Sequence, residues 1–124
     1  MTVETTAAFD VATFKRTYEE WDIDALLALY ADDVELVQID RDHPPSSPRT
    51  RHGSDVLRGM LEHCADAGVV ATVENTIADG QRAAATITCA FPGGRRVLAN
   101  AILELEHGRI VRELDVLSGD PKGT

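Results

Sequence analysis

The stretch "HGRIVRELDVLSG", residues 107–119, has the pattern of a β-strand that begins directly after a tight turn. His107 and Gly108 are typical of a two-residue hairpin loop, because such loops favour backbone conformations that glycine adopts readily. The strand carries the aliphatic residues Ile110, Val111, Leu114, Val116 and Leu117, yet Asp115 stands in their midst. A carboxyl group in a strand bound for the protein interior is destabilising unless something uses it or satisfies it. The position of Asp115 is therefore the main clue to function.

The chain before this hairpin predicts three further strands, separated by turn signals at Asp79–Gly80 and Pro92–Gly94. Short β-rich runs at such spacing are characteristic of antiparallel sheets. The predicted strands cover residues 69–77, 82–91, 95–106 and 109–118.

Helical periodicity dominates the first half of the chain. Asp10 can cap a first helix, Asp22 or Asp24 can start a second, and Ser54 can cap a third that Gly68 ends. The expected apolar stripes are Val11, Phe14, Tyr18 and Trp21; Ile23, Leu26, Leu27 and Tyr30; and Val56, Leu57, Met60, Leu61 and Cys64. Residues 32–40 read as a strand and the proline-rich residues 41–53 as a loop. The predicted order is ααβαββββ, an α+β domain with helices packed on one face of a curved sheet.

Length and charge set broad limits on function. At 124 residues, the chain predicts one domain over 1–124, with its core at about 10–120. The net charge of −9, from 21 acids and 12 bases, argues against nucleic acid or an anionic membrane as a partner. The N-terminus has no signal-peptide pattern, and Cys64 and Cys89 read as reduced thiols, so we expect a cytoplasmic protein.

The hairpin turn predicts a register for the last two strands. If Glu106 faces Arg109, then Asn100 lies directly opposite Asp115, Leu98 opposite Leu117, and Ile102 opposite Glu113. This predicts an amide and an acid together on one otherwise apolar sheet face. Either the pair is satisfied structurally, or it lines a pocket for proton transfer or for gripping a polar ligand.

The segments "WDIDALLALYADDVEL" and "LELEHGRIVRELDVLSGD", with the proline loop between the helices, resemble the nuclear transport factor 2-like superfamily, and its SnoaL-like branch in particular. The resemblance covers about residues 10–120. It implies a cone-shaped barrel: a strongly curved mixed β-sheet wrapped around N-terminal helices, with an internal pocket. It also implies pairing as a homodimer through the outer sheet face.

Members of this superfamily differ in chemistry, so the resemblance is carried over residue by residue. At the ketosteroid isomerase positions, this chain has Gln38 for the base, Phe14 near the tyrosine and Asn100 for the acidic donor. Asp115 matches an aspartate of limonene epoxide hydrolases, but the partner positions fall near Ala84 and Thr86. Asp115 also occupies a position that is commonly acidic among SnoaL-like cyclases, where Leu114 and Glu113 depart from the usual preceding residues.

The candidate site follows from these comparisons. Asp115 is the candidate catalytic acid/base, and the candidate ligand-binding residues are Asn100, Gln38, Asp40, Tyr30, Glu113 and His52. Asp40 shares strand parity with Gln38, and the loop arginines Arg41, Arg49 and Arg51 are expected near the pocket mouth. No HxH, HxxxH or HExxH spacing occurs, so we expect neither a metal nor any other cofactor.

Three functions remain open from the sequence. The first is a pocket protein for a small, mostly apolar organic ligand, acting as a cofactor-independent cyclase or isomerase through Asp115. The second is a metabolite-binding module without catalysis. The third is a dimeric assembly domain whose pocket is vestigial.

Overall fold

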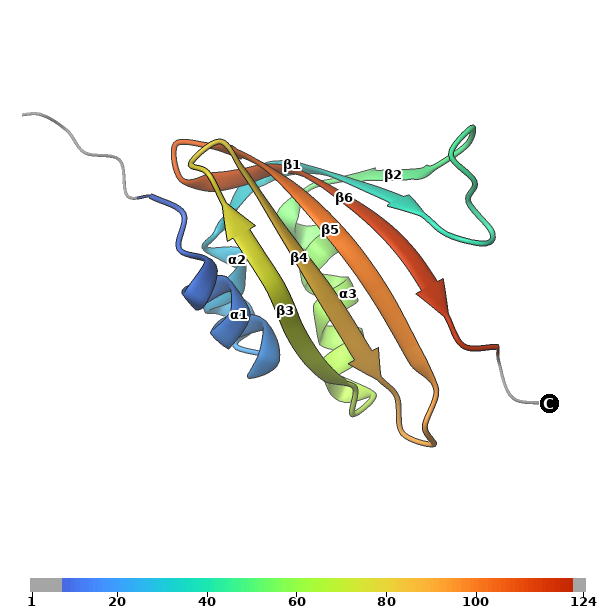
Figure 1. Ribbon diagram of the computed structural model, residues 1–124. Coiled ribbons are helices and arrows are strands. Elements are labelled where there is room, and N and C mark those ends of the chain that lie inside the picture. Colours follow the sequence, from blue (N-terminus) through green and yellow to red (C-terminus); the bar gives the residue numbers. More distant parts are fainter. Residues whose placement is uncertain (1–7, 122–124) are drawn as a thin grey trace, which may run out of the picture.

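The computed structural model describes residues 8–121. Within this range, three helices and six strands follow one another (Figure 1). They are α1 (Val11–Glu19), α2 (Ile23–Leu27), β1 (Tyr30–Ile39), β2 (Arg49–His52), α3 (Ser54–Asp66), β3 (Val70–Ala78), β4 (Arg82–Ala90), β5 (Arg96–Glu106) and β6 (Arg109–Gly119).

The strands form one curved sheet in the order β2-β1-β6-β5-β4-β3, and the helices cover one of its faces (Figure 1). Neighbouring strands pair antiparallel except β1 and β6, which run parallel. The mixed sheet and its helical layer confirm the predicted α+β cone. We call the helix-covered side the inner face and the other side the outer face.

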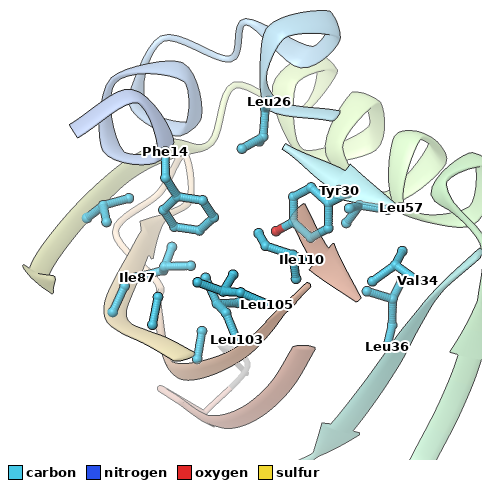
Figure 2. Packing of buried hydrophobic residues seen from close by; sticks show 14 of the residues in the cluster. Phe14, Leu26, Tyr30, Val34, Leu36, Leu57, Ile87, Leu103, Leu105 and Ile110 are labelled. Atoms are coloured by element: carbon cyan, nitrogen blue, oxygen red, sulfur yellow. The ribbon is translucent and has the colours of Figure 1, made fainter. Parts of the chain in front are cut away.

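Side chains from the helices and from the sheet meet in one core (Figure 2). Phe14 on α1 and Leu26 on α2 lie over Leu103 and Ile110, which come from β5 and β6. Each is no more than 1% exposed. The helices thus bury their apolar faces against the sheet, as the helical periodicity predicts.

Helix boundaries follow local chemistry in two cases and depart from it in one. The Asp10 side chain accepts a hydrogen bond from the backbone N–H of Ala12, as expected of an N-cap. Gly68, just after α3, has a φ of +77°, the left-handed conformation that ends many helices. Ser54 is not the cap of α3: Gly53 holds that position, and no side chain caps the helix.

The segment around Tyr30 corrects a second expectation. The sequence places Tyr30 on the stripe of the second helix, but α2 ends at Leu27 and Tyr30 begins β1. The backbone N–H of Ile110 donates to the carbonyl of Leu29, and Tyr30 pairs with Ile110. Strand pairing from a distant part of the chain therefore overrides a short local helical pattern.

The expected loop at 41–53 is wrong for Arg49–His52, which form β2. This strand pairs antiparallel with β1, with Gln38 opposite Arg49 and Leu36 opposite Arg51. The prolines of the preceding loop lie before the paired residues, so they remove no hydrogen bond between β1 and β2.

An extra residue in β6 corrects the predicted register of the closing hairpin. Glu106 pairs with Arg109 and Leu105 with Ile110, as the turn predicts, but Glu104 pairs with Arg112. Val111 therefore forms a β-bulge, which shifts every later pair by one residue. Asp115 pairs with Ala101 and Asn100 pairs with Val116, so the predicted Asn100–Asp115 pair does not exist.

Side chains of helix α1 hydrogen-bond to the backbone of β3, the edge strand of the sheet. The Lys15 ammonium donates to the carbonyl of Val73 at 2.6 Å, and the Glu19 carboxylate accepts from the N–H of Val73 at 2.9 Å. Trp21 adds a bond from its indole N–H to the carbonyl of Val69 at 2.8 Å. These contacts occupy backbone groups that an edge strand otherwise offers to another chain.

Candidate functional site

Two carboxyl groups lie beside each other on the inner face of β6. Residues two apart on a strand share a face, so Glu113 and Asp115 point the same way. Because β6 runs parallel to β1, Leu36 pairs with Glu113 and Gln38 with Asp115. The sheet thus gathers two acids and one amide under α3.

Tyr30 connects β1 to this pair. Its hydroxyl donates to Oε1 of Glu113 at 2.5 Å, and the two residues are 2% and 4% exposed. Figure 2 shows the Tyr30 ring in the middle of the core, between Leu26 and Ile110. A buried carboxylate is tolerated when it is well hydrogen-bonded, and this short bond supplies one partner for Glu113. The same bond occupies the hydroxyl, so Tyr30 supports Glu113 rather than facing a ligand.

Asp115 is in a different electrostatic position. Burial, the negative charge of Glu113 and a hydrogen bond with Glu113 raise the pKa of Asp115 well above its ordinary value. Two adjacent buried carboxyl groups do not both ionise readily, so one proton is retained on the pair. The raised pKa of Asp115 makes this residue the candidate holder of that proton. The Oδ1 atom of Asp115 is buried and has no hydrogen-bond partner among the described residues.

The carboxyl pair lies at the inner end of a narrow cavity. About 20 Å³ of it is wide enough for a water molecule, and the empty space is about 300 Å³ when space open to solvent is counted. A volume near 20 Å³ holds one water molecule. Its lining includes Leu36, Gln38, Leu57, Met60, Glu113, Asp115, Arg49 and Arg51. The cavity is therefore narrow beside the buried Glu113 and opens toward the exposed Arg49.

The predicted site residues divide between the two faces of the sheet. Gln38 lines the cavity and donates to the Asp40 carboxylate at 2.7 Å, so the structure brings these two together as expected. His52 points away from the cavity and lies 3.4 Å from Glu35. Asn100 is exposed on the outer face, where its amide oxygen accepts from the Thr86 hydroxyl.

Sequence reasoning missed the contact between Tyr30 and Glu113. The signal was present in the chain, since Glu113 and Asp115 stand two apart and must share a face of β6. The partner could not be inferred, because Tyr30 was expected on a helix rather than opposite Ile110.

Elsewhere the described residues offer less chemistry. A wider depression of about 480 Å³ lies by the bulge and is lined by Gln81, Arg82, Glu104, Leu105, Glu106 and Val111. No group of three His, Cys, Asp or Glu within residues 8–121 could hold a metal ion. None of the helices in that range has the length and apolarity to cross a membrane. Burial raises the pKa of the Cys89 thiol to about 11, so it is poorly nucleophilic at neutral pH.

Known proteins share both sequence pattern and fold with this chain. The family model described as "SnoaL-like domain" matches residues 11–113. A candidate ketosteroid isomerase from Kribbella flavida superposes with a TM-score of 0.71 at 19% identity, covering 92% of this chain and 78% of that one.

Two further solved structures give the same result. An NTF2-like protein of unknown function from Mesorhizobium loti has a TM-score of 0.72 at 20% identity, covering 88% of both chains. A candidate polyketide cyclase from Pseudomonas putida has a TM-score of 0.64 at 21% identity, covering 85% of this chain and 86% of its own. At these identities the structures show a shared fold alone. No curated protein matches the sequence.

Proposed function

Because this chain belongs to the SnoaL-like domain family, we propose that it is a cofactor-independent acid–base catalyst of the cyclase or isomerase type, with Asp115 as the proton carrier. One observation carries the proposal: a buried carboxyl group, whose pKa is raised by burial and by the neighbouring Glu113, presents an unpartnered oxygen at a cavity. Perturbed carboxyl groups of this kind in clefts are candidates for proton transfer.

The geometry suits a substrate that carries a carbonyl group. The closed end of the cavity accepts one polar atom, and the protonated Asp115 can donate to a carbonyl oxygen placed there. Proton transfer leaves Asp115 ionised beside the ionised Glu113, and their repulsion favours prompt recovery of a proton. Asp115 can therefore act first as an acid and then as a base. Glu113 is a positioning residue, and Tyr30 holds it in place.

Deuterium exchange tests this chemistry without knowledge of the natural substrate. A panel of small ketones and keto acids is incubated with the protein in deuterated water, and exchange of protons on the carbon next to the carbonyl is followed by NMR. We expect Asp115→Asn to reduce the protein-dependent rate by roughly 10²- to 10⁴-fold while ligand binding persists. Absence of protein-dependent exchange throughout the panel, or an unchanged rate in Asp115→Asn, would contradict catalysis.

Glu113→Gln separates positioning from proton transfer. The variant removes the negative charge that helps raise the pKa of Asp115. We therefore expect activity to persist, with the falling limb of the pH–rate profile moved to lower pH. A metabolite-binding module is the alternative: Asp115→Asn would then change affinity for a ligand that is never consumed.

The outer face supports a further part of the proposal, a homodimer. Leu98, Ile102 and Val116 lie together on β5 and β6 and are 39%, 48% and 46% exposed. The neighbouring outer positions Thr86 and Thr88 are uncharged, so two copies can meet there despite a net charge of −9 on each. Exposed apolar patches bounded by polar residues commonly mark protein interfaces. If the narrow cavity proves inactive, this face supports the assembly-domain alternative.

Ile102→Lys tests the dimer by placing a charge at the centre of the patch. We expect light scattering to show twice the 13.4 kDa chain mass for the unchanged protein and the single mass for the variant. Glu62→Lys, which alters an exposed residue of α3 on the helix-covered side of the sheet, is the control and should leave the dimer intact. A monomer before any substitution would refute this part of the proposal.

The cellular setting is also part of the proposal. Cys64 and Cys89 are free cysteines, which supports a cytoplasmic location.

A further inference from the structure

We infer that the mouth of the Asp115 cavity binds the carboxylate of a small keto acid, with Arg49 and Arg51 as its ligands. This inference rests on the proposed function, because it assigns a substrate class to the same cavity. It concerns the outer half of the site, which the proton chemistry of Asp115 leaves undefined.

The pairing of β2 aims both arginines at the cavity. Arg49 pairs with Gln38 and Arg51 with Leu36, and paired residues share a sheet face. Gln38 and Leu36 are inner-face residues that line the cavity, and both arginines line it as well. The residue after Arg51, His52, accordingly lies on the other face near Glu35.

These two arginines have no acidic partner, unlike others in the chain. Arg58 lies 2.8 Å from Asp24, and Arg112 lies 2.7 Å from Glu35. Among residues 8–121, by contrast, no carboxylate forms an ion pair with Arg49 or Arg51. The positive charge of Arg49 also adds to burial in lowering the pKa of Arg51, so the two guanidinium groups repel each other. An anion between them relieves that repulsion.

The charges around the cavity favour a single negative charge on the ligand. Among the lining residues, two guanidinium groups face two carboxyl groups that do not both ionise readily, so positive charge exceeds negative charge in the lining. A monoanion such as a carboxylate balances this excess, whereas a doubly charged phosphate ester overshoots it.

The same charges fix the orientation of the ligand. A carboxylate at the inner end would meet Glu113, so it must lie outward at the arginines. The inner end then holds a neutral hydrogen-bond acceptor, such as a ketone oxygen, to which the protonated Asp115 donates. Leu36, Leu57 and Met60 supply apolar contacts for the carbon chain between the two groups. A carboxylate and a ketone joined by a short chain meet all three requirements.

Binding measurements on matched acid and ester pairs test the inference. Pyruvate, levulinate and a longer oxo acid are each titrated against isotope-labelled protein by NMR, alongside their methyl esters and propyl phosphate. At least one acid should bind about tenfold or more tightly than its ester, because charged hydrogen bonds at this site are lost with the ester. The protein amide signals whose chemical shifts change on binding of this acid should lie on β2 and around Asp115. Propyl phosphate should bind more weakly.

Three variants decide the outcome. Arg49→Gln and Arg51→Gln should each abolish the preference for acid over ester. Arg41→Gln, which changes an exposed residue of the loop before β2 that does not line the cavity, should preserve it. Asp115→Asn should keep the preference, so loss of turnover and loss of anion binding are separable. The inference fails if no acid outcompetes its ester, if phosphate binds equally well, or if Arg41→Gln has the same effect as the cavity variants.

Discussion

On the inner face of β6, Glu113 and Asp115 lie together under the helices, whereas on the outer face of β5 Asn100 hydrogen-bonds to Thr86 in contact with solvent. Asn100 and the two acids come from one hairpin, because β5 and β6 are consecutive paired strands. The outer amide exchanges protein partners for water at little cost. The inner acids have lost that exchange, so one must hold a proton and the other depends on Tyr30.

The largest expected effect comes from removing that dependence. Tyr30→Phe deletes the donor to Glu113 Oε1 inside the core, and a lost bond to a buried charge costs about 1.5–3 kcal/mol of unfolding free energy. Urea denaturation at neutral pH measures the loss. Tyr18→Phe is the matched control, since the Tyr18 hydroxyl makes no hydrogen bond with any described residue, and it should stay within about 0.5 kcal/mol. Equal losses in the two variants would show that the Tyr30–Glu113 bond has no special weight.

The second effect is a dependence of stability on pH. The pKa of Asp115 is higher in the folded chain than its ordinary value of 3.8, so folding strengthens proton binding. The stability that this proton contributes is fully present below that value and is lost as pH rises toward the raised folded pKa, by at most about 1.4 kcal/mol per pH unit. The stability of the unchanged protein should therefore fall relative to Asp115→Asn as pH rises above about 4. Asp42→Asn, in the exposed loop, retains Asp115 and should lose stability with rising pH as the unchanged protein does.

The smallest effect belongs to the outer face. Thr86→Val removes the 2.8 Å bond to Asn100 but leaves both positions exposed to water or half-buried. Surface changes of this kind usually stay within about 0.5 kcal/mol, and we expect the same here in denaturation at any pH near neutrality. A loss as large as that of Tyr30→Phe would erase the contrast between the two faces.

Much of the fold could be predicted because its signals are local. The Asp10 cap, the end of α3 at Gly68, the turn at His107–Gly108 and the long strands all follow from neighbouring residues. Tyr30 and β2 could not be placed so readily, because each is fixed by pairing with β1 or β6. Local propensity is a weak guide where such tertiary pairing decides.

The site was predictable only in part for a similar reason. The interior position of Asp115 and the pairing of Gln38 with Asp40 follow from strand alternation. Asn100 was assigned to the wrong side, because a bulge inside a strand leaves no clear mark on an aliphatic sequence. The width of the cavity depends on side-chain packing across three elements, which periodicity does not report.

The unpaired Val111 also bears on how related chains should be aligned. Adding or removing one residue at this point exchanges the two sides of everything that follows in the strand. Two homologues with the same acid at matching distances from the turn could therefore carry it in opposite compartments, one at a catalytic hollow and one at a docking surface. An alignment gap placed one position away from the bulge would equate residues that lie on opposite faces of the sheet.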